Sequence, residues 1–278
     1  MTCIVGDETR LPQGTNFIVY DLEAVGDARF PSQCRIWNLA AVHLGSGKEF
    51  NVFVDPESKE EYPEPPHPDL YRVTKAFLRD RGARPFKEVG TEFFNWVESF
   101  GQSPTVLISH GNFMLDKPLL EYEYGRGGIA LPHSWYFFDT LPWFRAVMRR
   151  EPSYSMKNLY RSAFAEDIPD QHFALPDAKA LVRLVKKTAD TAHDLRGVLY
   201  PPYYTPLQRV KYLGSYNEKL LVQGGIQCVE DLHLILLQHC HLDLGEMKRA
   251  LSERFHIRHD SAYKIANSIL HMLLIPKP

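Results

Sequence analysis

Two acidic residues, Asp21 and Glu23, follow directly on a short apolar run at residues 17–20 of this 278-residue chain. Apolar, β-branched and aromatic residues in such a run predict a buried strand. Because side chains alternate along a strand, Asp21 and Glu23 would share one face while Leu22 points to the other. Two close carboxylates repel, and a hard divalent cation such as Mg²⁺ or Mn²⁺ relieves the repulsion because it prefers oxygen ligands. The alternative places both carboxylates in an exposed loop after the strand, since short motifs also occur by chance.

Two further segments carry residues of the same chemical types. Residues 105–109, TVLIS, predict another buried strand, and Asp116 follows near the start of a predicted helix. His172 and Asp177 come just before a long predicted helix at 178–196. Taken alone, Asp116 is explained as a first-turn residue that stabilises its helix, and His172 as an exposed loop histidine. Their order after Asp21 and Glu23 favours a shared site.

In this order the three segments resemble the motifs of the DEDDh family of 3′→5′ exonucleases, the DnaQ-like group with proofreading subunits and TREX-like enzymes. The third segment, HFALPD, matches H-x-A-x-x-D without a gap, and FIVYDLEAVG and LISHGNFMLDKPLL resemble the first two motifs. FDTLPWFR and YSMKNLYRSAF resemble the segments between the second and third motifs. The resemblance covers about residues 15–196 and is most TREX-like. A further similarity is to the exonuclease-like region at the C-terminal end of the longest PML isoform and its fish relatives.

The expected fold is α/β, a ribonuclease-H-like exonuclease fold whose mixed five-stranded sheet is flanked by helices, followed by a small C-terminal all-α domain. Apolar patterning predicts the strands at residues 16–23, 35–44, 49–54, 105–109 and 135–138. Helical spacing predicts helices at 70–79, 86–100, 141–150 and 178–196, with others starting near 116 and 155.

The resemblance implies a two-metal-ion hydrolysis of phosphodiester bonds with Mg²⁺ or Mn²⁺. Asp21 would bridge two ions, Glu23 and Asp177 would complete the ligands of the first, and Asp116 would orient the second through water. His172 would be the general base, because histidine has an ordinary pKa of about 6.5, which suits proton abstraction near neutrality. The expected reaction removes nucleoside 5′-monophosphates from 3′ ends of single-stranded DNA or of a frayed duplex.

The resemblance also implies a substrate-binding set. The terminal nucleotide would contact the backbone at Leu22 and Ala24, and the set is completed by His110, Asn112 and Tyr154.

Two positions depart from the family pattern. The asparagine that usually follows the second-motif histidine is replaced by Gly111, and the threonine that often ends the first motif is Val25. Both departures concern rate or substrate positioning more than metal binding.

Composition limits the partners. With a formal net charge of −2, the chain has no global positive field to attract nucleic acid or a membrane, so metal ions or local basic residues would hold a polyanion. Candidate basic residues for holding a polyanion are Lys117, Lys157 and Arg161.

The four cysteines show no C-x-x-C spacing, and no signal segment or long apolar run is present. We therefore expect an intracellular protein, nuclear or cytoplasmic and not secreted.

The proline- and tyrosine-rich residues 201–206 predict a linker between an exonuclease domain at 1–200 and a helical domain at 207–278. The second domain resembles a helix-hairpin-helix or SAM-like element, with Gly214 as the weak support for phosphate binding. The alternative is a small helical bundle that packs on the nuclease or binds a protein partner. His239, Cys240 and His241 lack the spacing of a structural zinc site.

Two other functions stay open at this point. One is an RNA-directed exonuclease with the same mechanism, because no residue decides how the 2′-hydroxyl is read. The other is a catalytically weak exonuclease fold kept as an interaction module, for which Gly111 and Val25 leave room.

Overall fold

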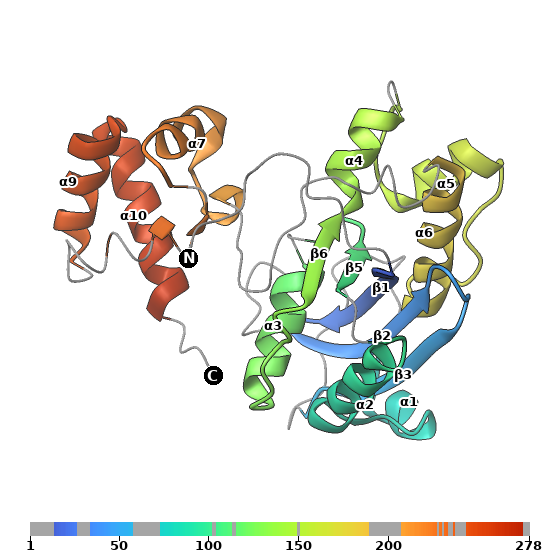
Figure 1. Ribbon diagram of the computed structural model, residues 1–278. Coiled ribbons are helices and arrows are strands. Elements are labelled where there is room, and N and C mark those ends of the chain that lie inside the picture. The colour runs from blue at the N-terminus through green and yellow to red at the C-terminus, as the bar shows by residue number, and fades with distance from the viewer. Residues whose placement is uncertain are drawn as a thin grey trace. The chain divides into compact units, whose positions relative to one another are not determined.

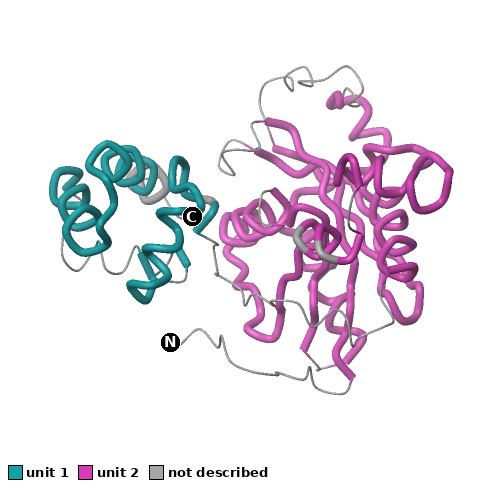
Figure 2. Tube along the Cα trace, turned by 90° about the horizontal axis from the view of Figure 1, so that it is seen from above, with its two compact units in different colours: residues 1–7, 203–278 teal, residues 8–202 magenta. Residues whose placement is uncertain are grey.

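The computed structural model describes residues 14–26, 34–57, 73–101, 104–112, 115–148, 151–188, 207–226, 228–229, 231–232, 236 and 243–274. These residues fall into two compact units, one within residues 8–202 and one within 203–278 (Figure 2). In the described ranges, no helix is both long and apolar enough to cross a membrane.

The larger unit is built on a six-stranded mixed sheet with the strand order β4-β3-β2-β1-β5-β6. Figure 1 labels the five longer strands of this sheet. The strands are β1 (Asn16–Val25), β2 (Arg35–His43), β3 (Glu49–Asp55), β4 (Arg84–Pro85), β5 (Thr105–Ser109) and β6 (Trp135–Asp139). Strands β1, β2 and β3 pair antiparallel, whereas β5 runs parallel to both β1 and β6. The five expected strands are confirmed. The sixth, β4, has only two residues beside the end of β3, too few to produce a sequence pattern.

Helices cover both faces of this sheet. They are α1 (Lys75–Asp80), α2 (Phe86–Glu98), α3 (Asp116–Arg126), α4 (Thr140–Val147), α5 (Met156–Phe164) and α6 (Ala174–Thr188). Ile18, Tyr20 and Leu22 of β1 belong to the apolar core formed with α2 and α3. Val19, between them, belongs to the core formed with α5 and α6. Alternate residues of β1 therefore serve opposite layers, as the period of a strand requires.

Helix boundaries differ from the predictions by a few residues. Helix α6 begins at Ala174 rather than at residue 178, so Asp177 lies within its first turn. Asp139 caps α4 and Ser155 caps α5, each accepting a backbone N–H bond, as expected of N-cap side chains. Residues 70–72, 149–150 and 189–196 of the predicted helices lie outside the described residues.

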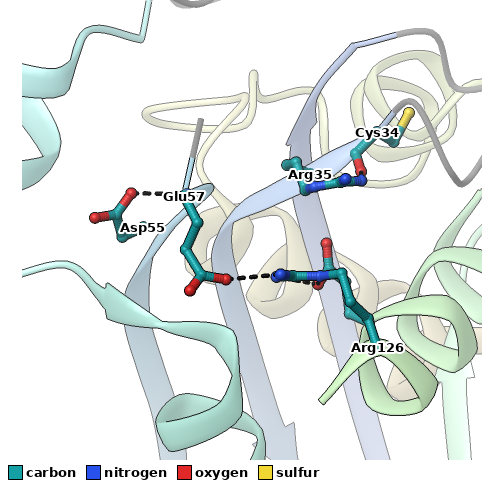
Figure 3. Close-up of polar contacts among 6 residues, drawn as sticks. Cys34, Arg35, Asp55, Glu57 and Arg126 are labelled. Carbon is teal, nitrogen blue, oxygen red and sulfur yellow. Dashed lines mark hydrogen bonds and ion pairs between the residues drawn. The ribbon is translucent and has the colours of Figure 1, made fainter. Parts of the chain in front are cut away.

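Helix α3 carries charged residues whose side chains lie inside the fold. Glu123 is buried, and one of its carboxylate oxygens accepts from Arg126, which also bonds Glu57 at 2.8 Å (Figure 3). The ammonium group of Lys117 is likewise buried and pairs with Glu121 at 2.6 Å, so it does not form part of an exposed basic patch. Amphipathic spacing misses both cases because each charge is paired inside the fold.

The smaller unit is helical. Its described elements are η3 (Leu207–Arg209), α7 (Gly214–Gln223), α9 (Leu244–Phe255) and α10 (His259–Leu274). They enclose their own apolar core, to which Leu221, Leu251 and Ile265 contribute. Its helix-hairpin-helix or SAM-like character stays a prediction, and residues 239–241 lie outside the described residues.

Candidate active site

Strand β1 lies between β2 and β5 in the sheet and carries the first two candidate residues (Figure 1). Asp21 stands opposite Ala40 of β2, and Glu23 stands opposite Asn38. Both carboxylates are partly buried on the face opposite Tyr20 and Leu22. The alternative of an exposed loop is wrong, because β1 continues to Val25.

Asp116 reaches this site from α3. It is the first residue of that helix, and it is buried. The hydroxyl of Ser109, at the end of β5, donates to Asp116 Oδ2 at 2.7 Å. The backbone N–H of Leu22 also bonds this carboxylate, so Asp116 lies against β1 at Leu22.

His172 and Asp177 come to the site with α6, which packs against β1 and β2. The backbone N–H of His172 donates to Asp177 Oδ2 at 3.0 Å. One ligand atom each from Glu23, His172 and Asp177 lies within 4.8 Å of the others. Residues far apart in sequence thus form one cluster.

Burial and mutual repulsion control the charge of this cluster. Burial, reinforced by Asp116, Glu23 and Asp177, raises the pKa of Asp21 well above its ordinary value. Burial and the charges of Asp177 and Asp116 raise the pKa of Glu23 to about 8. Burial raises the pKa of Asp116 to about 7 despite its hydrogen bond from Ser109. Burial raises the pKa of Asp177 to about 6, against the effect of the His172 N–H. Full ionisation therefore needs a compensating cation.

A divalent cation fits these residues. Asp177 Oδ1 is buried and has no hydrogen-bond partner among the described residues, although its other oxygen is bonded. A buried carboxylate oxygen without a partner is costly, and a metal ion would satisfy it. Several carboxylate oxygens beside one imidazole form a donor set that can hold a divalent cation.

The predicted substrate-binding residues occupy different kinds of position. Leu22 and Ala24 flank Glu23 on β1, with Leu22 buried and Ala24 partly buried. The imidazole of His110 is engaged on both sides, with Nε2 2.7 Å from the Tyr154 carbonyl and Nδ1 3.0 Å from Thr140 Oγ1. Because a carbonyl only accepts, Nε2 carries a hydrogen atom. Burial lowers the pKa of His110, which favours its neutral form.

Asn112 is not brought to the site surface. It is fully buried, its Oδ1 accepts from the Tyr20 hydroxyl at 2.5 Å, and its Nδ2 donates to the Phe138 carbonyl at 3.0 Å. Tyr154 is partly buried, and its hydroxyl donates to the Met148 carbonyl at 2.9 Å. Asn112 thus has a structural position, whereas Leu22 and Ala24 adjoin the carboxylates.

Sequence reasoning missed two supporting residues. Ser109 holds Asp116, and Asn38 of β2 binds the segment after His172. Each is a polar residue in or at the end of an apolar strand. That pattern is the signal by which they could have been found, because a polar group buried in a sheet needs a specific partner.

Comparison with known proteins identifies the family. The RNase_T family model, described as an exonuclease, matches residues 18–185, which is more than half of the chain. The chain belongs to this exonuclease family. A search of curated proteins finds no match.

Solved structures show the same fold. The zinc-bound complex of E. coli ExoI with ssDNA matches with a TM-score of 0.54 and 18% identity over 66% of this chain and 42% of that one. E. coli exonuclease I with a dA16 oligonucleotide gives 0.53 and 17%, over 65% and 42%. The nuclease domain of 3′hExo, a DEDDh family member bound to rAMP, gives 0.52 and 15%, over 65% and 94%.

The chain therefore spans about two fifths (42%) of exonuclease I. Together with the family match, these structures confirm the resemblance to DEDDh exonucleases and the ribonuclease-H-like exonuclease fold. The similarity to the PML-encoded region stays a prediction.

Proposed function

We propose that this protein is a metal-dependent 3′→5′ exonuclease that releases nucleoside 5′-monophosphates from nucleic acid ends. The observation that carries the proposal is the convergence of Asp21, Glu23, Asp116 and Asp177 with His172 in a chain of the exonuclease family. An exonuclease fold kept only as an interaction module would not need to retain mutually repelling, buried carboxylates.

The four carboxylates would hold two divalent cations, Mg²⁺ or Mn²⁺, with Asp21 shared between them. When bound, such ions neutralise charge that develops on the phosphate and lower the pKa of water. Glu23 and Asp177 would serve one ion, and Asp116, held by Ser109, would orient the other. The partnerless Oδ1 of Asp177 supports this assignment.

His172 would accept the proton of the attacking water at a ring nitrogen. It lies just before α6, and its backbone is bonded to Asp177, so the proposed base and metal ligand are fixed together. The proton would leave to solvent from the partly exposed imidazole. This arrangement favours general-base catalysis, because the base lies beside the groups that would hold the phosphate.

The substrate would be a 3′ end of DNA, single-stranded or frayed from a duplex. Exonuclease I structures hold ssDNA, whereas 3′hExo is bound to rAMP, so RNA is the alternative substrate. The backbone at Leu22 and Ala24 would contact the terminal nucleotide, and Tyr154 would stack on a base. His110 and Asn112 would support the site, because their side chains are bonded within the protein.

We assign this activity to residues 1–200, and a role in nucleic-acid or protein binding to the helical residues 207–278. An intracellular location, nuclear or cytoplasmic, is part of the proposal.

A substrate panel tests the proposal. Single-stranded, blunt and 3′-recessed oligonucleotides, as DNA and as RNA, would each be incubated with Mg²⁺, Mn²⁺ or EDTA, and the released nucleotides identified by chromatography. We expect nucleoside 5′-monophosphates from DNA, dependence on metal, and strong inhibition by a blocking group on the 3′-hydroxyl. Release of 3′-monophosphates, or cleavage that ignores the 3′ block, would contradict it.

A further inference from the structure

Strand β2 contains a bulge beside the carboxylate cluster. Glu23 pairs with Asn38, but the next residue of β1, Ala24, pairs with Ile36, so Trp37 has no opposite residue. Ile36 and Leu39 both join the core under α2 and α3. In a regular strand, residues three apart point to opposite faces, whereas Ile36 and Leu39 share one. The bulge interrupts the alternation, so Trp37 and Asn38, which lie between them, need not point to opposite faces.

Trp37 and Asn38 both contact the segment that follows His172. The Trp37 ring packs edge-on against the Phe173 ring, with 5.8 Å between centroids. The Asn38 Oδ1 accepts from the backbone N–H of Ala174 at 2.9 Å. Two consecutive bulge residues therefore bind the two residues immediately after the proposed general base.

The orientation of the Asn38 amide is fixed from its other side. Its Nδ2 donates to Asn51 Oδ1 at 3.0 Å and to the Val52 carbonyl at 3.1 Å, both on β3. Asn38 is also buried, with 1% of its surface exposed. Its Oδ1 is consequently held toward Ala174, where it satisfies an N–H group at the start of α6 that has no partner within the helix.

His172 itself has φ = 72°, in the left-handed region that residues other than glycine rarely adopt. Such a conformation persists only when its surroundings determine it. Asp177 holds the His172 N–H, and the bulge holds Phe173 and Ala174. The backbone of His172 is thus held at its own N–H and through the two residues that follow it.

We propose that Trp37 and Asn38 are positioning residues that fix the His172 imidazole for general-base catalysis, an inference that rests on the proposed function. Neither residue is expected to touch the substrate. Since a displacement of about 1 Å can cost about 100-fold in rate, Asn38→Ala should lower kcat by about 10- to 100-fold, while KM stays within about twofold.

A double-mutant cycle distinguishes positioning from a general structural role. The activities of wild type, Asn38→Ala, His172→Ala and the double variant would be compared, with the exposed Asn95→Ala as the matched control. We expect the loss from Asn38→Ala to shrink to about twofold or less in the His172→Ala background. An equal loss in both backgrounds would overturn the proposal.

Hydrogen–deuterium exchange supplies a readout that does not require activity. Asn38→Ala should speed exchange at Ala174 and across residues 172–177 while leaving α2 unchanged. Unchanged exchange would reject the positioning role, whereas an inactive wild type with the expected exchange would reject only the proposed function. Should Asn38→Ala not fold, Phe173→Leu enters the same cycle with the same expected pattern.

Discussion

At Asp116, one hydrogen bond opposes a strongly unfavourable environment. Burial raises the pKa of this carboxyl to about 7, although the Ser109 hydroxyl, donating at 2.7 Å, favours the ionised form. A hydrogen bond to a charged group contributes about 1.5–3 kcal/mol, about tenfold or more in an equilibrium constant. Ser109 thus helps to keep Asp116 ionised near neutral pH.

Ser109→Ala should therefore raise the pKa of Asp116 further and weaken divalent-cation binding by about tenfold at neutral pH. The weakening should diminish as the pH rises, because the carboxyl then ionises without help. Mn²⁺ titrations at several pH values would measure it, with the exposed Ser215→Ala as control. An affinity equal to that of wild type at every pH would contradict this role.

Divalent-cation binding should also release protons. Glu23, with its pKa raised to about 8 mainly by burial, is largely protonated at neutral pH, and a bound cation would displace that proton. Affinity should accordingly rise from about pH 6 to about pH 8. Calorimetry in buffers of different ionisation enthalpy measures the protons released. Binding with no proton release near pH 7 would be inconsistent with the cluster.

At the scale of residues, the motifs predicted the four carboxylates and His172 as site residues, and the structure brings these side chains close together. The motifs did not point to Ser109 or Asn38, because a single polar residue in an apolar strand indicates that a buried partner exists but not which residue it is. Their roles depend on partners that only the folded chain supplies. The burial of Asn112 was not visible for the same reason, because its side chain bonds Tyr20 and Phe138, far away in the sequence, and its part in substrate binding stays a prediction.

At the scale of elements, the C-terminal half of α3 is joined to the end of β3 through charges. Arg126 bridges the buried Glu123 and the more exposed Glu57, while Glu123 Oε1 has no hydrogen-bond partner among the described residues (Figure 3). Burial raises the pKa of Glu123 even with Arg126 beside it. Arg126 is therefore the cation that stabilises the ionised form of the buried Glu123 carboxylate.

Arg126→Ala should destabilise the protein by about 3 kcal/mol, because it leaves a buried carboxylate without its ion-pair partner. Glu57→Ala should cost less than about 1 kcal/mol, since that pair is partly exposed. Urea denaturation measures both, with the exposed Arg79→Ala as a matched control. Similar costs for Arg126→Ala and Arg79→Ala would refute the assignment.

The strands and helices of the sheet unit were predictable because their apolar periods are long and clear. Three features were not predictable. Strand β4 is too short to have a period, and the bulge at Trp37 is a change of register that depends on the pairing of β1 with β2. The burial of Glu123 was also hidden, because its pairing with Arg126 is not visible in hydropathy.

At the scale of the whole molecule, the acidic cluster should make stability depend on pH. A carboxyl whose folded-state pKa is raised binds more protons when folded, so its contribution to stability is lost as the pH rises through that pKa. Asp116 and Glu23, with folded-state pKa values of about 7 and about 8, place this loss between about pH 4, where an unfolded carboxyl ionises, and about pH 8. Burial lowers the pKa of His110, so at lower pH this residue makes stability rise with pH instead.

In EDTA, the midpoint of thermal unfolding should fall between about pH 6.5 and about pH 8, and Mg²⁺ should reduce that fall. Glu23→Gln should flatten the curve, because it removes the group that titrates near pH 8. Scanning fluorimetry measures all three curves. A midpoint that rises with pH over this range would contradict the expected sign.

The most direct test of the central claim compares wild type with Asp21→Asn on one single-stranded DNA labelled at its 5′ end. With Mg²⁺, the wild type should produce a ladder that shortens from the 3′ end over time. Asp21→Asn keeps the side-chain shape but removes the shared carboxylate, so it should produce no ladder, and neither should wild type in EDTA. No shortening by folded wild type, or equal shortening by both proteins, would contradict the account.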